Sequence, residues 1–153
     1  MIQDPFRSMI RSEGVLRYRD LPWRRTRDPY IIWLSEVMLQ QTQVPRVETR
    51  MPAWLDRFPT VQALVDCEEE ELFKCWEGLG YYSRARNLQK TARLLVEQYD
   101  GQLPADYRQL TTLPGIGDYT AGAIASIAFG IAVPAVDGNV LRVFARLYND
   151  PRL

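Results

Sequence analysis

The stretch Leu113-Pro114-Gly115-Ile116-Gly117-Asp118-Tyr119-Thr120-Ala121 predicts a tight turn that leads directly into a helix. Proline fixes one φ angle, and the two glycines accept backbone conformations that other residues avoid. Residues 105–112 suit a short helix before the turn, and the small, apolar run 120–128 suits a helix after it. Glycines allow a phosphate to approach the backbone closely, and the N–H groups at a helix start bind anions. The pattern therefore fits an anion-binding helical hairpin, although an ordinary helix–helix turn with a glycine stop fits it too.

Three further stretches place polar or aromatic residues at positions where they could have a functional role. Residues 33–43 (WLSEVMLQQTQ) place one acid, Glu36, in an otherwise apolar helical pattern. Residues 78–87 (GLGYYSRARN) place two tyrosines and two arginines after a glycine-rich turn, and residues 136–140 (VDGNV) put Asp137 at a predicted helix start. Taken one at a time, these features also fit a solvated glutamate, aromatic core packing and an ordinary helix N-cap.

The four stretches, in this order, resemble the helix-hairpin-helix family of base-excision DNA glycosylases, most closely the adenine DNA glycosylases of the MutY type. The resemblance covers about residues 20–148. It implies an all-α fold in which 1–153 form a single helical glycosylase domain. Within it, 1–28 would belong to a companion helical domain, 29–137 would form a six-helix barrel with the hairpin at 105–129, and 138–153 would begin a truncated return to the companion domain.

The resemblance also assigns roles to individual residues. Glu36 is expected to be the catalytic acid and Asp137 the group that stabilises a cationic sugar, with Tyr119 and Asn139 hydrogen-bonding in the same site. The pocket for the extruded base is expected to contain Trp23, Arg24 and Leu39. The residues expected to contact DNA are Gln41, Thr42, Tyr81, Arg84, Arg86, Gly115, Ile116 and Gly117. Burial of Glu36 among apolar neighbours would raise its pKa and keep a proton available near neutral pH.

The implied reaction is the removal of adenine mispaired with 8-oxoguanine or guanine from double-stranded DNA, after the base is extruded from the helix. Protonating the base and stabilising an oxocarbenium-like sugar is two-carboxylate chemistry, as in glycoside hydrolysis. Tyr119 stands where endonuclease III relatives carry the lysine that attacks the sugar, so we expect a monofunctional enzyme. We also expect the protein to be a monomer. The alternatives are an endonuclease III-like glycosylase/lyase and a catalytically incomplete DNA-binding fragment.

Composition narrows the chemistry further. The chain has no histidine, which excludes Ser-His-Asp and Cys-His catalysis within it, and it has only two cysteines. Two thiols cannot supply the four ligands of the 4Fe-4S cluster that full-length family members carry, so we expect no cofactor or metal in this chain. The net charge is zero, but 1–30 and 78–99 are basic while 66–77 is acidic. No apolar run is long enough to span a bilayer, and we expect an intracellular protein, cytoplasmic or nucleoid-associated.

Local signals predict about eight helices. Asp28-Pro29 is a typical helix start, and Thr60 is expected to cap a short helix over 61–65. A helix over 44–57 is expected to kink or break near residues 50–51, because Pro52 lies in its interior.

Overall fold

The computed structural model describes residues 5–16 and 19–149, and in these residues it contains nine α-helices, one 3₁₀ turn and no β-strand. The predicted all-α class is therefore confirmed. The elements are α1 (Pro5–Leu16), η1 (Pro22–Arg24), α2 (Pro29–Leu39), α3 (Val44–Arg57), α4 (Val61–Val65), α5 (Glu69–Trp76), α6 (Ser83–Tyr99), α7 (Tyr107–Thr111), α8 (Asp118–Ile127) and α9 (Gly138–Tyr148).

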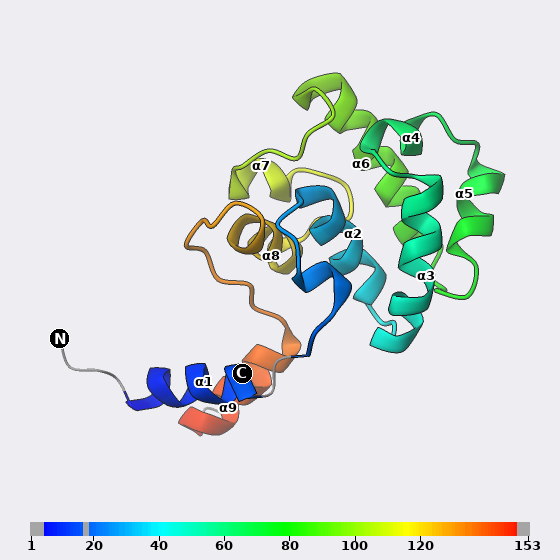
Figure 1. Ribbon diagram of the computed structural model, residues 1–153. Helices are drawn as coiled ribbons and strands as arrows, with labels where there is room; N and C mark the ends of the chain where they lie inside the picture. The colour runs from blue at the N-terminus through cyan, green and yellow to red at the C-terminus, as the bar shows by residue number, and fades with distance from the viewer. Residues whose placement is uncertain (1–4, 17–18, 150–153) are drawn as a thin grey trace.

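Helix α2 lies in the middle of the main body and packs against α3, α6 and α8 (Figure 1). It begins as predicted, because the Asp28 side chain accepts a hydrogen bond from the Tyr30 amide at 2.8 Å and proline occupies the first turn. Trp33, Leu34 and Met38 are at most 1% exposed. This apolar helix is thus fixed on several sides, which gives the polar residues on it a rigid support.

Helix α8 packs beside α2 and owes its close contacts to small side chains. Residues 120–125 of α8 are all buried. A Cβ atom added at Gly122 would lie 2.3 Å from the carbonyl oxygen of Pro134, so the extended segment after α8 crosses the helix at a point where only glycine fits. This crossing brings the chain from α8 to the start of α9.

The helix predicted over 44–57 is confirmed as α3, which runs through Pro52 without the break that was one of the two expected outcomes. Pro52 is exposed. The carbonyl that loses its intrahelical partner at a proline can therefore bond to water, which makes the proline tolerable on this side of the helix. The Thr60 cap is confirmed, because its hydroxyl accepts a hydrogen bond from the Ala63 amide at 3.2 Å.

The hairpin is formed by α7, a turn and α8, and both helices are close to their predicted ranges. Asp106 caps α7, and Gly115 has a φ of 76° in the turn. A Cβ at Gly115 would lie 2.9 Å from the Cβ of Asn87, and the hydroxyl of Thr91 donates to the carbonyl of Pro114 at 2.8 Å. The hairpin is thus held against α6.

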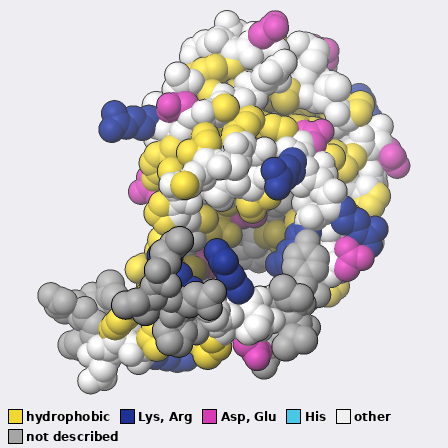
Figure 2. Space-filling view, turned by 60° about the vertical axis from the view of Figure 1, so that its left-hand side comes forward, with side chains coloured by type: hydrophobic (Ala, Val, Ile, Leu, Met, Phe, Trp, Pro, Cys, Tyr) yellow, Lys and Arg dark blue, Asp and Glu magenta, His cyan; other side chains and the backbone are white. Residues whose placement is uncertain are grey.

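Helices α1 and α9 lie away from the body formed by α2 to α8 (Figure 1). The division at 1–28, 29–137 and 138–153 stays a prediction, and residues 1–4, 17–18 and 150–153 lie outside the described part of the chain. Acidic and basic side chains are interspersed on the face seen in Figure 2. No helix within the described ranges is long and apolar enough to cross a membrane.

Candidate active site

A cavity of about 920 Å³ opens between η1, α2, the start of α8 and the start of α9. Figure 2 shows this side of the molecule hollowed between the upper body and the lower part, with hydrophobic side chains inside the hollow. A cavity of this size is in the range that holds small organic groups. Its lining residues are Trp23, Arg24, Ile32, Ser35, Glu36, Leu39, Gln40, Gln41, Tyr119, Ile127, Asp137 and Asn139.

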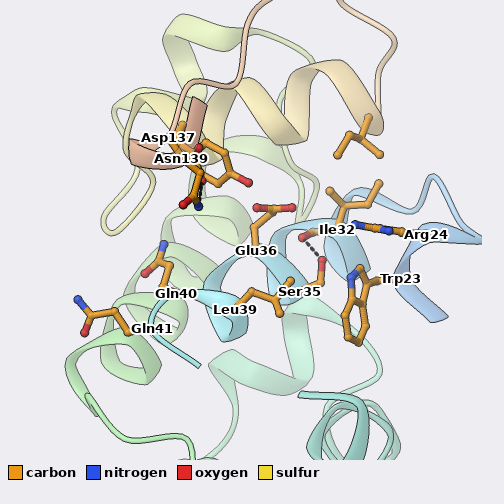
Figure 3. Close-up of a pocket in the computed structure, with 12 residues that line it drawn as sticks. Trp23, Arg24, Ile32, Ser35, Glu36, Leu39, Gln40, Gln41, Asp137 and Asn139 are labelled. Carbon is orange, nitrogen blue, oxygen red and sulfur yellow. Dashed lines mark hydrogen bonds between the residues drawn. The ribbon is translucent and has the colours of Figure 1, made fainter. Parts of the chain in front are cut away.

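Glu36 projects from α2 into the middle of this cavity and points toward Asp137 and Asn139 (Figure 3). It is half-buried, and burial raises the pKa of its carboxyl group above the ordinary value. The Tyr119 hydroxyl, as a hydrogen-bond donor, and the charge of Arg24 oppose this rise, while the negative charge of Asp137 adds to it. Glu36 therefore retains its proton to a higher pH than a solvated glutamate does.

Tyr119 reaches the cavity from the first turn of α8. Burial raises its pKa to about 12, and the neighbouring carboxylates of Glu36 and Asp137 contribute to the rise. The phenol is therefore protonated at neutral pH and can donate a hydrogen bond to the Glu36 carboxyl group. The two residues come from sequence positions far apart, and the packing of α2 against α8 brings them together.

Asp137 is the N-cap of α9 and has the opposite electrostatic character. One carboxylate oxygen accepts a hydrogen bond from the Val140 amide at 2.8 Å. The other accepts one from the Asn139 side-chain amide at 2.9 Å (Figure 3). These bonds, the Val140 one first, lower the pKa of Asp137. The cavity thus holds one carboxyl with a raised pKa and one with a lowered pKa.

The three residues predicted for the base pocket all line this cavity. Trp23 is buried in η1, Arg24 is exposed beside it, and Leu39 ends α2. The sequence interpretation did not name four other lining residues, Ile32, Ser35, Gln40 and Ile127. The small Ser35, directly before Glu36 in an apolar helix, was the available signal, and its buried hydroxyl donates to the Ile32 carbonyl at 2.8 Å.

Two predicted DNA contacts, Gln41 and Tyr81, are exposed and have left-handed backbone conformations, with φ of 57° and 47°. Gln41 lies at the rim of the cavity, and Tyr81 is 64% exposed just before α6. Such conformations are uncommon for residues other than glycine and occur often at functional positions. Thr42 is half-buried, and its hydroxyl lies 3.3 Å from the Leu79 carbonyl oxygen.

Arg84 differs from the prediction that it contacts DNA. Its side chain is buried, with 8% of the residue exposed, and its guanidinium donates to the protein's own backbone instead of facing outward. It lies between the end of α2 and the turn before α6. Helical position alone did not reveal this, because the carbonyl acceptors at the end of α2 are about 45 residues away in the sequence.

The remaining predicted contacts lie outside the cavity lining. Arg86 is exposed, and its Nε donates to a carboxylate oxygen of Glu69 at 2.6 Å. In the hairpin, Gly115 and Gly117 are exposed whereas the side chain of Ile116 is buried. The Ile116 amide donates to the Leu113 carbonyl at 3.1 Å, so the exposed backbone of this turn is that of Gly115 and Gly117.

No group of three or more histidine, cysteine, aspartate or glutamate side chains suited to a metal ion occurs in the part of the chain that is described. Cys67 and Cys75 are free cysteines. An iron–sulfur cluster needs four thiolates, and the whole sequence has two cysteines, so this chain's own residues do not fit one.

Residues 34–152 match the family described as HhH-GPD superfamily base excision DNA repair protein. The chain is 49% identical to adenine DNA glycosylase from Homo sapiens, over 93% of this chain and 28% of the human protein. A solved thermostable thymine-DNA glycosylase superposes with a TM-score of 0.88 at 31% identity, covering 95% of this chain and 69% of that one. For an endonuclease III–DNA complex the TM-score is 0.81 at 28% identity, with 94% and 67% covered.

These likenesses confirm the predicted helix-hairpin-helix glycosylase fold. They do not test the roles of individual residues, which stay predictions. The chain spans less than a third of the length of the human relative. By family match and by fold, the chain belongs to the HhH-GPD superfamily of base excision DNA repair proteins.

Proposed function

We propose that this chain carries the catalytic pocket of a monofunctional DNA glycosylase that removes adenine mispaired with 8-oxoguanine or guanine. The observation that carries the proposal is the pair of carboxyl groups in one cavity, Glu36 with a raised pKa and Asp137 with a lowered pKa. Opposite shifts in one site divide two acids into a proton donor and a permanent anion. The identity to the human adenine DNA glycosylase supports adenine as the base.

In this proposal the adenine leaves the DNA stack and enters the cavity beside Trp23 and Leu39. Glu36 transfers its proton to the base, at N7 by resemblance to the family, and so makes the base a better leaving group. The bond between the sugar and the base then breaks, and positive charge develops on the sugar. A water molecule adds to the sugar carbon and loses a proton, which completes the hydrolysis. Asp137 lies on the opposite side of the cavity from α2 and stabilises this charge, held in place by Val140 and Asn139.

Tyr119 supports the monofunctional assignment. A lyase reaction needs an amine that attacks the sugar carbon and forms a Schiff base. The tyrosine hydroxyl cannot form one, and its pKa of about 12 keeps it protonated. Its proposed role is to orient the Glu36 carboxyl through a hydrogen bond.

The proposed DNA surface combines three parts. Gln41 and Tyr81 are exposed side chains that would enter the DNA stack, where an amide reads base edges and an aromatic ring stacks. The hairpin at 113–117 would bind a phosphate with backbone N–H groups at the start of α8. Arg86 is exposed on α6 and would contribute positive charge, in exchange for its ion pair with Glu69.

The test is adenine release from a duplex with adenine opposite 8-oxoguanine, read as strand breaks with and without alkali. We expect breaks that require alkali and that Glu36→Gln abolishes. Breaks without alkali would contradict the monofunctional assignment and favour the lyase alternative. Absence of release by a chain that circular dichroism shows to be folded would contradict activity of this chain and leave a DNA-binding module.

A further inference from the structure

Arg84 is the buried centre of a hydrogen-bond cluster that joins two separate segments. Its Nη1 donates to carbonyl oxygens at the end of α2, those of Val37 (2.8 Å), Met38 (3.0 Å) and Gln40 (2.5 Å). Its Nη2 donates to the Thr42 hydroxyl (3.1 Å) and to the carbonyl oxygens of Leu79 (2.8 Å) and Gly80 (3.1 Å). One guanidinium therefore binds the segment just before Gln41 and the turn just before Tyr81.

Two of the acceptors directly precede the two exposed residues in the chain and so restrain their backbone. Gln40 immediately precedes Gln41, and Gly80 immediately precedes Tyr81, and both exposed residues have positive φ values. The positive charge also lies at the C-terminus of α2, where it interacts favourably with the free carbonyl groups. The guanidinium is 5.9 Å from the centre of the Tyr81 ring, so it contacts the aromatic side chain as well.

We propose that Arg84 is a positioning residue that holds Gln41 and Tyr81 in register, so that the two side chains enter DNA as one unit. The inference rests on the proposed function, because it assumes that both side chains enter the DNA stack. It replaces the expected DNA contact of Arg84 with an internal role. Thr42 belongs to the same hydrogen-bond cluster, since its hydroxyl lies between the Arg84 guanidinium and the Leu79 carbonyl.

Lysine cannot take over this role. The guanidinium is planar and presents its donors in a fixed fork, whereas an ammonium group is a single point with three donors. Nη1 bonds to the end of α2, whereas Nη2 bonds to Thr42 and to the turn before Tyr81, and one ammonium cannot occupy both positions. The turn before α6 has other anchors, from Arg46 to the Gly78 carbonyl (2.7 Å) and from the Trp76 indole to the Gly80 carbonyl (2.9 Å). Arg84→Lys is therefore expected to fold but to uncouple the segments.

The experiment measures the Kd for a duplex with adenine opposite 8-oxoguanine, at one fixed salt concentration, by fluorescence anisotropy. All variants of the full chain carry Glu36→Gln, so that the substrate stays intact. Gln41→Ala and Tyr81→Ala are measured singly and together, each with Arg84 and with Arg84→Lys. Arg93→Lys is the matched control, because it makes the same change at an exposed position of α6.

With Arg84 present, we expect Tyr81→Ala to weaken binding by about fivefold or more, as loss of one base-stacking ring does. We expect Arg84→Lys to weaken binding about as much as the Gln41→Ala, Tyr81→Ala pair. Adding either alanine to Arg84→Lys should then change Kd by less than about twofold, and Arg93→Lys should leave it unchanged. A general loss of stability would not remove the effect of Tyr81→Ala in this selective way.

The inference is overturned if Arg84→Lys binds like its parent, or if Tyr81→Ala keeps its full effect beside Arg84→Lys. If both alanines leave binding unchanged even with Arg84, the proposed DNA surface is wrong and the inference falls with it. The experiment thus distinguishes two failures: one in which Gln41 and Tyr81 contact DNA but Arg84 does not position them, and one in which neither side chain contacts DNA. Should Arg84→Lys fail to fold, Thr42→Val takes its place, because it removes the hydroxyl that contacts both Arg84 and Leu79 and leaves the carbonyl contacts of Arg84 intact. A partial loss of coupling is then expected, and an undiminished effect of Tyr81→Ala beside Thr42→Val would overturn the inference.

Discussion

Glu36 and Asp137 show how neighbouring groups separate two acids of similar chemistry. Glu36 is on a helix whose other faces are apolar, and burial is the largest influence on its pKa. Asp137 is at the start of α9, where hydrogen bonds to its carboxylate outweigh burial. The difference arises from the two positions in the fold, because a solvated Glu and a solvated Asp have similar pKa values.

A pH titration of stability tests the raised pKa of Glu36. Because folding raises this pKa, the contribution of Glu36 to stability is complete below the unfolded-state pKa and is lost as pH rises through the folded-state pKa. Glu36→Gln cannot ionise. We expect its free energy of unfolding, minus that of the unsubstituted protein, to increase between pH 4 and pH 8 in urea titrations.

Asp137 contributes with the opposite sign, since its lowered pKa gives stability that is lost as pH falls. Both proteins in the comparison keep Asp137, so this contribution cancels in the difference. A difference that stays flat or decreases over this range would contradict the raised pKa of Glu36. Adenine release should likewise decline as pH rises and Glu36 loses its proton.

Asp137→Asn separates the structural and the chemical role of this residue. Asparagine caps helices about as well as aspartate, so the free energy of unfolding should change by less than about 0.5 kcal/mol, whereas Asp137→Ala should cost about 1 kcal/mol. Adenine release should be lost in both, because both lack the anion. Activity in Asp137→Asn close to that of the parent would mean that Asp137 is a helix cap only.

At the level of elements, the two glycines of the hairpin turn differ. Gly115 has a conformation that the turn requires, whereas Gly117 has an ordinary conformation beside open space. Gly115 has a φ of 76°, and an added Cβ would lie 2.9 Å from Asn87. Gly117 has an extended backbone with a φ of −83°, and its missing Cβ would meet no heavy atom within 4 Å. Both glycines are exposed, so burial does not distinguish them, whereas the backbone conformation and the contact with Asn87 do.

This distinction predicts unequal effects of the same substitution. Gly115→Ala should lower the free energy of unfolding by about 1–2 kcal/mol, the cost of a left-handed conformation for a residue with a Cβ. Gly117→Ala should change it by less than about 0.5 kcal/mol, because a weaker N-cap is offset by a less flexible unfolded chain. Urea unfolding of the two variants measures both values, and equal effects would contradict this account of the turn.

Local sequence signals predicted the elements well and the contacts between elements poorly. Asp28, Thr60 and Asp137 cap helices within three residues of themselves, so each cap can be read from its neighbours. Arg84 contacts carbonyls about 45 positions away, and no local pattern distinguishes it from the exposed Arg86 two residues later. The break considered at Pro52 does not occur, because the effect of a proline on a helix depends on whether its side of the helix faces water, which the local sequence does not state.

The proximity of Glu36, Tyr119 and Asp137 was expected from family resemblance alone, because spacing along the chain carries no information about it. In the structure, it depends on the packing of α2 on α8 and on the segment that crosses Gly122. Ile127 and Gln40 entered the cavity lining for the same reason. The site is therefore a property of the assembled body and not of any one helix.

For the whole molecule, α9 presents an exposed apolar surface. Every residue of this helix is exposed or half-buried, and Val143 and Leu147 are 57% and 48% exposed. These two side chains are four positions apart and so lie on one face of the helix. Exposed apolar area of this kind favours association between molecules at high concentration.

We expect the pair Val143→Glu and Leu147→Lys to reduce self-association of the chain, measured by sedimentation velocity over a range of concentrations. Its free energy of unfolding should change by less than about 0.5 kcal/mol, because exposed positions contribute little to the core and the new charges are spaced to form an ion pair. The control is Arg93→Glu with Glu97→Lys, which exchanges the charges of two exposed residues on α6 without changing apolar area. Equal association in both variants and the parent would show that the α9 face does not drive it, whereas a large loss of stability would show that this face is packed against the protein in solution.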